Sequence, residues 1–196
     1  MIAVIDYDMG NFRSLENALA RLGAQSVVTS DPDIIRKASR VILPGVGHAG
    51  KAMDNLRERN LTELIPSLRQ PVLGICVGMQ VLCRTSEEAP GKACMGVFDA
   101  HVRKFSPSPG CKVPHMGWNT LGNAEGKLLR DIGPAPYVYF VHSFYACTGP
   151  DTVATCRYAD VLLSAALRYE NFYGTQFHPE KSGAAGELIL KNFLAL

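Results

Sequence analysis

The sequence predicts an α/β fold in which a central, mostly parallel sheet is flanked by helices. Short apolar runs of strand type alternate with segments of helical periodicity through residue 82, which is typical of a parallel sheet covered on both faces. Beyond residue 83 the strand-type segments follow one another without long helices, so we expect hairpins and a mixed sheet. A length of 196 residues corresponds to roughly 1.3 average domains, and we expect one domain over residues 1–196.

The first half of the chain supplies the alternating elements. Strands are predicted at residues 2–5, 27–28, 41–43 and 72–75. Helices are predicted at residues 15–22, 32–38, through 53–56, at 64–68 and at 79–82. The first of these helices stops at Gly23, and the second begins with Asp31 as its cap and Pro32 in its first turn. This order of elements predicts successive strand-helix units.

The second half is richer in strands. They are predicted at residues 96–105, 137–145, 153–158, 165–169 and 172–177. The segment 106–118 contains three prolines and two glycines, which predicts a long surface loop within the domain. A closing helix follows Ser182, and its apolar side is formed by Ile189, Leu190, Phe193 and Leu194.

Composition narrows the classes of partner. Twenty basic residues against eighteen acidic ones give a net charge of +2, and the basic residues are scattered, so we expect neither nucleic-acid nor membrane binding. No apolar run reaches the roughly 18 residues of a membrane span, and we expect no secretory leader. The six cysteines lack the paired spacing of a zinc site, so we expect no metal and a reducing, cytoplasmic location.

A nucleophile motif follows the strand at residues 72–75. Gly74-Ile-Cys-Val-Gly78 has the pattern Gly-x-nucleophile-x-Gly between a strand and a helical run. Such a turn exposes Cys76 at the strand end and directs the next helix's N–H groups at the sulfur, which favours the thiolate. The alternative is a buried cysteine in a glycine-rich turn. The other five cysteines have no comparable setting.

A base for this thiol is predicted at His178. Pro179 cannot extend a strand ladder, so His178 lies at a strand end with Glu180 two residues on. Side chains at i and i+2 project to the same side, which lets Glu180 reach and orient the imidazole. The alternative is a turn with a solvated Glu180. The combination with Cys76 favours catalysis.

A glycine-rich segment precedes the helix at residues 53–56. Gly45, Gly47 and Gly50 fit the dinucleotide-binding pattern G-x-G-x-x-G, but the segment follows the third strand and the next strand ends in Cys76 instead of an acidic residue. Beside Cys76 the same glycines serve better as a flexible loop that presents N–H groups to a tetrahedral oxyanion. A plain tight turn is the third interpretation.

Several motifs together carry a resemblance. Pro44-Gly-Val-Gly47, Gly74-Ile-Cys-Val-Gly-Met-Gln80 and Phe177-His-Pro-Glu180 resemble, in order and spacing, the class I (triad) glutamine amidotransferases. More narrowly, the chain resembles the glutaminase subunits of imidazole glycerol phosphate synthase, from histidine biosynthesis. That resemblance rests on Asp6-Tyr-Asp-Met-Gly-Asn11, Pro114-His-Met-Gly-Trp-Asn119, Tyr139-Phe-Val-His-Ser-Phe144 and Asn171-Phe-Tyr-Gly174. Val77 and Asp8 depart from the usual residues, Leu and a small residue respectively.

The resemblance implies a fold, a reaction and a site. It implies a class I glutamine amidotransferase-like fold with a nucleophile elbow, and hydrolysis of L-glutamine to glutamate and ammonia without any cofactor. Cys76 would be the nucleophile, His178 the general acid and base, and Glu180 its orienting carboxylate. The family's oxyanion and substrate-binding positions correspond here to Gly45, Val46, Gly47, Gln80, His142, Ser143 and Phe144.

The resemblance also implies a partner. Such subunits form a heterodimer with a cyclase, a (β/α)8 barrel that receives the ammonia. The positions that face the cyclase correspond to Asn11, Met116, Trp118 and Lys181. Trp118 is the single tryptophan, in a Pro/Gly-rich segment, where an exposed contact and a loop-anchoring core role are both open. A subunit of a different synthase, a silent regulatory subunit and a cysteine peptidase remain alternatives.

Overall fold

The computed structural model describes residues 1–107 and 112–196. Its centre is a seven-stranded sheet of order β10-β11-β12-β4-β3-β1-β2. Five neighbouring strands of this sheet are parallel: β2 (Ser26–Thr29), β1 (Ile2–Ile5), β3 (Arg40–Leu43), β4 (Val72–Ile75) and β12 (Phe172–Thr175). β11 (Val161–Tyr169) is antiparallel to β12, and β10 (Thr152–Tyr158) is antiparallel to β11. The predicted mostly parallel, mixed sheet is therefore confirmed.

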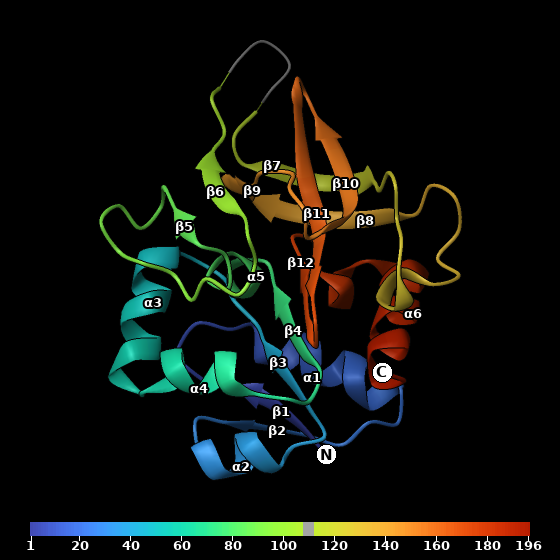
Figure 1. The fold of residues 1–196 in the computed structure, drawn as a ribbon. Coiled ribbons are helices and arrows are strands. Elements are labelled where there is room, and N and C mark those ends of the chain that lie inside the picture. The colour runs from blue at the N-terminus through green and yellow to red at the C-terminus, as the bar shows by residue number, and fades with distance from the viewer. Residues whose placement is uncertain (108–111) are drawn as a thin grey trace.

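Helices cover both faces of the parallel part. α3 (Ala49–Glu58) and α4 (Leu61–Ser67) lie on the left of the sheet in Figure 1, and α1 (Phe12–Arg21) and α6 (Gly183–Leu194) lie on its right. α2 (Pro32–Lys37) lies beside β2, and the single turn α5 (Val77–Gln80) follows β4 directly. Every residue of β1, β4 and β12 is buried, as expected for strands covered on both faces.

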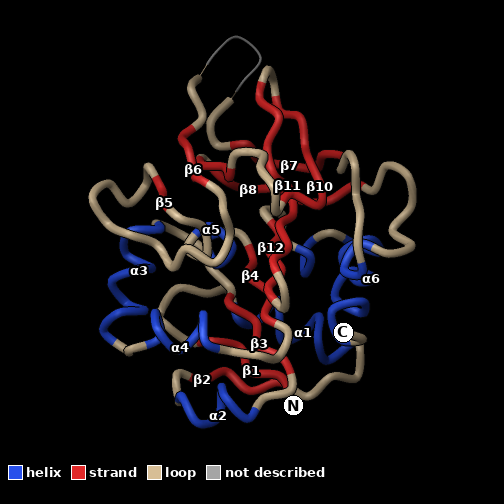
Figure 2. Tube along the Cα trace, in the orientation of Figure 1, coloured by secondary structure: helices blue, strands red, loops and turns tan. Residues whose placement is uncertain are grey.

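Smaller sheets form the upper end of the molecule. β5 (Thr85–Ser86), β6 (His101–Lys104) and β9 (Phe144–Ala146) make a three-stranded sheet, and β7 (His115–Thr120) pairs antiparallel with β8 (Tyr137–His142). Figure 2 shows strands and loops at this end and helices elsewhere. Two short 3-10 turns, at Lys127–Leu129 and Pro179–Lys181, complete the elements of residues 1–107 and 112–196. These sheets pack against the antiparallel strands of the central sheet, β9 against β11 and β7 against β10.

Local signals in the sequence correctly place most elements. The Asp31 side chain accepts hydrogen bonds from the N–H groups of Asp33 and Ile34, so the predicted cap of α2 is confirmed. Leu15, Ala18 and Leu19 are buried in α1, and the closing helix lies where it is predicted. No helix of the described residues is long and apolar enough to span a bilayer.

Several predicted boundaries are wrong. The loop prediction for residues 106–118 fails at its end, because β7 begins at His115 and pairs with β8. Within that segment, Pro109, Gly110 and Cys111 lie outside the described residues. The strand predicted at 96–105 spans only 101–104, and that predicted at 137–145 is divided at Ser143. Where these strands begin and end depends on the strands with which they pair, and the sequence of the segment itself does not specify that pairing.

Gly78 provides a direct test of the packing at the end of β4. A Cβ atom at this position would lie 1.9 Å from the carbonyl oxygen of Leu43, which belongs to β3. We expect Gly78→Ala to lower the free energy of unfolding by about 3 kcal/mol or more, because backbone must move to admit the methyl group. Denaturant unfolding measures the change.

Gly91→Ala is the matched control. Gly91 has a φ of +73°, and a Cβ added there would meet no atom within 4 Å. The methyl group therefore has room, and we expect only the backbone strain of a left-handed conformation, about 1 kcal/mol. Equal losses for the two variants would contradict the proposed crowding at Gly78.

Candidate active site

The candidate site lies where three neighbouring parallel strands end. β3 is followed by the glycine-rich loop of residues 44–48, β4 by Cys76, and β12 by the segment that contains His178. The carboxyl ends of parallel strands share one edge of a sheet, so three segments that are distant in the sequence meet there. The structure thus brings together the glycine-rich loop, the nucleophile motif and the segment with His178 and Glu180, as the resemblance predicts.

Cys76 occupies the predicted nucleophile elbow. Its φ is 54° and its ψ is −110°, a backbone conformation that residues with a side chain rarely adopt. Its N–H donates a hydrogen bond of 2.7 Å to the carbonyl of Thr175, which joins the elbow to β12. The thiol lies 3.9 Å from the carbonyl oxygen of Val141 and 3.8 Å from Nε2 of Gln176. The elbow therefore holds the sulfur at one place, between β8 and β12.

His178 and Glu180 form the predicted pair. Nδ1 of His178 donates to Oε1 of Glu180 over 2.8 Å, and the two side chains are only 3% and 5% exposed. The backbone of His178 is held from two sides, because its N–H donates to the carbonyl of Tyr139 and its carbonyl accepts from the hydroxyl of Ser182. The solvated-carboxylate alternative for Glu180 is thereby excluded.

The charge environment of His178 favours its protonated form. Burial by itself lowers the pKa of this imidazole, but interactions with Cys76 and Glu180 outweigh burial and hold the pKa well above its ordinary value. Nε2 is buried and has no hydrogen-bond partner among the described residues. This nitrogen is thus available to exchange a proton with a group bound beside Cys76.

The loop of residues 44–48 carries free backbone donors. Among the described residues, the N–H groups of residues 45–48 donate no hydrogen bond to protein. At the end of the loop, Glu88 accepts a hydrogen bond of 2.7 Å from the N–H of Ala49, at the start of α3. Oxyanion holes are commonly built from backbone N–H groups that have no other partner.

A cavity of about 260 Å³ opens over Cys76. The predicted substrate-binding residues that line it are Val46, Gly47, Gln80, His142, Ser143 and Phe144, together with Cys76 and His178. Gly45 is not among the residues that line this cavity, and it packs against Val77, the residue after Cys76. Glu88, which no sequence motif indicates, also lines the cavity. In the sequence, Glu88 is recognisable only as an acidic residue in the segment that follows α5.

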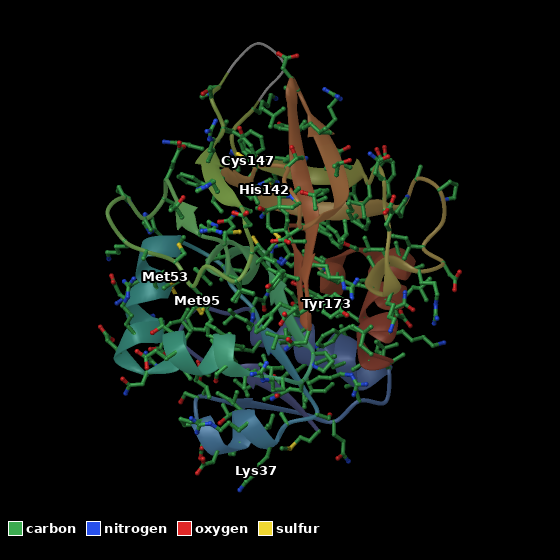
Figure 3. The ribbon with its side chains drawn as sticks, viewed as in Figure 1. Lys37, Met53, Met95, His142, Cys147 and Tyr173 are labelled. Carbon is green, nitrogen blue, oxygen red and sulfur yellow. The ribbon has the colours of Figure 1, made fainter. Side chains whose placement is uncertain are left out.

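Two side chains hold the wall of this cavity at Phe144. Its carbonyl accepts hydrogen bonds from Nε2 of Gln80 at 2.9 Å and from Nδ1 of His142 at 2.7 Å. His142, labelled in Figure 3, lies in the upper layer of strands. Because its Nδ1 carries the proton, its Nε2 accepts from Nδ1 of His115 at 2.9 Å. The two imidazoles thus form a directed chain that ends at the cavity wall.

The residues predicted to face a partner lie on the surface near the site. Met116 and Trp118 on β7 are 63% and 51% exposed, which rules out a core role for the tryptophan. The Trp118 ring lies 6.1 Å from that of Tyr139, and the Lys181 ammonium lies 5.8 Å from the centre of the same Tyr139 ring. Asn11 is exposed in the loop before α1. The role of these residues in an interface stays a prediction.

The departures in the motifs have local explanations. Asp8 adopts a φ of 62° and forms an ion pair with Arg59 at the end of α3. Aspartate tolerates this left-handed conformation better than most residues. Val77 is buried and lines the cavity beside Cys76. Within residues 1–107 and 112–196, no group of three His, Cys, Asp or Glu side chains is placed to hold a metal ion.

Comparison with known proteins decides the family. The family model described as glutamine amidotransferase class-I matches residues 3–196. The chain belongs to the class-I glutamine amidotransferases. Membership of this family accounts for the elbow at Cys76, the pair of His178 and Glu180, and the glycine-rich loop of residues 44–48. It therefore replaces the dinucleotide-binding interpretation of the glycines in that loop.

Individual relatives show which members of the family this chain resembles in sequence. The chain is 50% identical to the imidazole glycerol phosphate synthase subunit HisH of Bacteroides thetaiotaomicron, over 100% of this chain and 99% of that protein. It is 45% identical to the subunit of the same name from Escherichia coli K12, with the same coverage. The resemblance that the motifs indicate is therefore confirmed.

Solved structures agree at the level of the fold. A crystal structure of a glutamine amidotransferase superimposes with a TM-score of 0.76 and 20% identity, covering 100% of this chain and 98% of the other. PurLQS from Thermotoga maritima gives a TM-score of 0.67 and 19% identity, covering 99% and 97%. The expected class I amidotransferase fold is confirmed.

The buried histidine pair of this amidotransferase predicts an acid-sensitive fold. Burial lowers the pKa of His115 to about 4 and that of His142 to about 3, whereas both have a value of 6.5 in the unfolded chain. The unfolded chain therefore binds more protons below pH 6.5, and stability falls as the pH drops from 6.5 towards 4. We expect His115→Gln to reduce this loss, measured as the melting temperature between pH 7 and pH 4.

His101→Gln is the control for this measurement. His101 is an exposed histidine whose ring contacts the hydroxyl of Thr85. Its variant should keep the pH dependence of the wild-type protein. If His115→Gln and the wild type lose melting temperature in parallel over this range, the pair does not contribute the predicted acid sensitivity.

Proposed function

We propose that this chain hydrolyses L-glutamine to glutamate and ammonia as the glutaminase subunit of an imidazole glycerol phosphate synthase. The ammonia would pass to a cyclase subunit that makes imidazole glycerol phosphate and an aminoimidazole carboxamide ribotide. The observation that carries the proposal is the strained elbow that holds Cys76 beside the buried His178–Glu180 pair, under a cavity that Val46 and Gly47 of the glycine-rich loop also line. The full-length similarity to HisH subunits supports the choice of synthase.

The reaction begins at Cys76. Its thiolate attacks the side-chain amide carbon of glutamine, and the negative charge moves to the amide oxygen. N–H groups of the glycine-rich loop stabilise that oxygen, and Val46 and Gly47 are the loop residues that line the cavity. The raised pKa of His178 keeps a proton on the imidazole while Cys76 is a thiolate. His178 gives that proton to the departing nitrogen, so ammonia leaves and a thioester forms on Cys76.

Water completes the cycle. The neutral His178 removes a proton from a water molecule, which attacks the thioester carbon, and the bond to Sγ breaks to release glutamate. Glu180 holds the proton of Nδ1 throughout, so Nε2 faces the reacting groups and the imidazolium is stabilised when it forms. Every proton in this scheme passes through one nitrogen of His178.

The cavity suits a small zwitterion. Its volume of about 260 Å³ lies near the lower end of ordinary ligand pockets. The carboxylate of Glu88 supplies a negative charge for the α-ammonium group of glutamine. Gln80, His142 and Ser143 provide polar groups on the wall, and we assign them to orientation of the substrate.

The proposed partner is a (β/α)8-barrel cyclase in a heterodimer. Exposed Trp118 and Met116, with Lys181 above the Tyr139 ring, form a surface beside the segment that carries His178 and Glu180. Aromatic residues and methionine are enriched in protein interfaces. We propose that Asn11 belongs to the same interface.

We further propose that residues 1–196 act as one amidotransferase domain in the cytoplasm. The central sheet draws strands from both halves of the chain, which supports a single unit. The five described cysteines are free thiols, and free thiols persist in a reducing compartment.

Substitutions in the triad test the chemistry. We expect Cys76→Ala to abolish glutamine hydrolysis in the complex with the cyclase, because the nucleophile is lost. We expect His178→Ala to lower kcat by about 10²-fold or more, and Glu180→Gln to retain more activity than His178→Ala, because an orienting group contributes less than the base. Release of glutamate measures these rates.

Labelling identifies the nucleophile independently. A glutamine-analogue electrophile should modify Cys76, and Cys83→Ala, which removes a buried thiol, is the control that should keep wild-type activity and labelling. A label on another cysteine, or full turnover by Cys76→Ala, contradicts the assignment. A wild-type complex that releases no glutamate would favour the silent regulatory subunit.

Association with the cyclase tests the surface. We expect Trp118→Ala to weaken the heterodimer by about tenfold or more, because an exposed aromatic residue at an interface commonly contributes over 1 kcal/mol. Tyr169→Ala is the control. Tyr169 is the last residue of β11, is 47% exposed and pairs with Phe172 at the start of β12, the end of that strand away from His178. Equal dissociation constants for the two variants would remove Trp118 from the interface.

A further inference from the structure

Tyr7 is a fully buried side chain that contacts the glycine-rich loop. It lies two residues beyond the end of β1, and its hydroxyl donates a hydrogen bond of 2.6 Å to the carbonyl oxygen of Pro44. Pro44 is the first residue of the loop whose N–H groups at residues 45–48 have no hydrogen-bond acceptor in the described part of the chain. The bond joins positions 37 residues apart in the sequence, so it ties the loop after β3 to the segment after β1.

The backbone of Tyr7 is itself anchored. Its carbonyl accepts a hydrogen bond of 2.8 Å from Nδ2 of Asn55, a buried residue of α3. The preceding residue, Asp6, donates its N–H to the carbonyl of Thr29 in β2 over 2.9 Å. The backbone around Tyr7 is therefore tied to α3 and to β2, which limits how far its hydroxyl can follow a movement of the loop.

The contact with Pro44 determines the direction of an N–H group. The carbonyl of Pro44 and the N–H of Gly45 belong to one planar peptide unit, so holding the oxygen also orients the hydrogen. The unit is confined on its other side as well. A Cβ at Gly45 would lie 2.7 Å from the Tyr7 hydroxyl and 2.5 Å from the N–H nitrogen of Gly78 in α5.

The far end of the loop is held separately. Glu88 accepts from the N–H of Ala49, and Nδ1 of His48 accepts from the N–H of Gly50 over 3.0 Å. Between these two attachments, the N–H groups of residues 45–48 make no hydrogen bond to the described part of the chain. Tyr7 at one end and Glu88 at the other thus limit rotation of peptide planes to the short segment between them.

We propose that Tyr7 is a positioning residue for glutamine hydrolysis, whose hydroxyl orients the Pro44–Gly45 peptide and so aligns the oxyanion donors of the loop with Cys76. The inference rests on the proposed function. Burial raises the pKa of Tyr7 above its ordinary value, and the charge of Cys76 raises it further, so the hydroxyl stays a donor at working pH.

Tyr7→Phe in the complex with the cyclase tests the proposal. The variant keeps the ring and removes the one donor, which leaves the Pro44 carbonyl free to turn. We expect kcat for glutamine hydrolysis to fall about tenfold, a part of the roughly 10²- to 10³-fold effect of losing an oxyanion donor completely. We expect KM to change by less than about twofold, because the Tyr7 hydroxyl does not line the cavity.

Alkylation of Cys76 by iodoacetamide separates positioning from general damage. In this reaction a bond forms between Sγ and the methylene carbon while iodide leaves, so no tetrahedral oxyanion develops and the loop donors are not needed. We expect the alkylation rate of Tyr7→Phe to match that of the wild type between pH 6 and pH 9. Cys76→Ala identifies any signal from other thiols.

Tyr173→Phe is the matched control. Tyr173 is a buried tyrosine of β12, labelled near the middle of the molecule in Figure 3, and its loss of a hydroxyl should leave kcat and alkylation unchanged. A wild-type kcat for Tyr7→Phe overturns the proposal, and so does a parallel fall of kcat and alkylation. Failure of the wild-type complex to hydrolyse glutamine would instead contradict the proposed function.

Discussion

The site depends above all on the register in which β4 pairs with β12. Gly74 lies opposite Gly174 and Ile75 opposite Thr175, so the residues that follow both strands emerge at one edge. The register is held at both ends. Asn171 donates to the carbonyls of Leu68 and Gln70 before the strands, and the N–H of Cys76 donates to Thr175 after them. A slip of one residue would turn Cys76 and His178 to opposite faces.

Close backbone packing makes the strained elbow possible. The positive φ of Cys76 costs of order 1–3 kcal/mol and persists only where the surroundings determine it. Those surroundings are the carbonyl of Leu43 against Gly78, and the Tyr7 hydroxyl against Gly45. The same contacts bring the loop after β3 close to the sulfur. Backbone strain, close packing and the placement of the proposed oxyanion donors are thus parts of one arrangement.

Features encoded over a few neighbouring residues could be predicted. The elbow around Cys76 and the pairing of His178 with Glu180 each depend on a spacing of two residues beside a strand end, and both have the expected geometry. Glu88 was missed because it enters the cavity from a loop, without a motif of its own. The strand at His115 was missed because its partner β8 lies more than twenty residues further on.

The sequence by itself determined the fold class, the family resemblance and the chemistry available to the site. Alternating periodicities and short motifs carry this information, because they act through local backbone geometry. Only the tertiary structure decided which groups meet. The contact of Tyr7 with Pro44, the chain from His115 to Phe144 and the position of Glu88 join distant segments. Such contacts follow from the order and register of the strands, and the sequence of a short segment does not specify either of them.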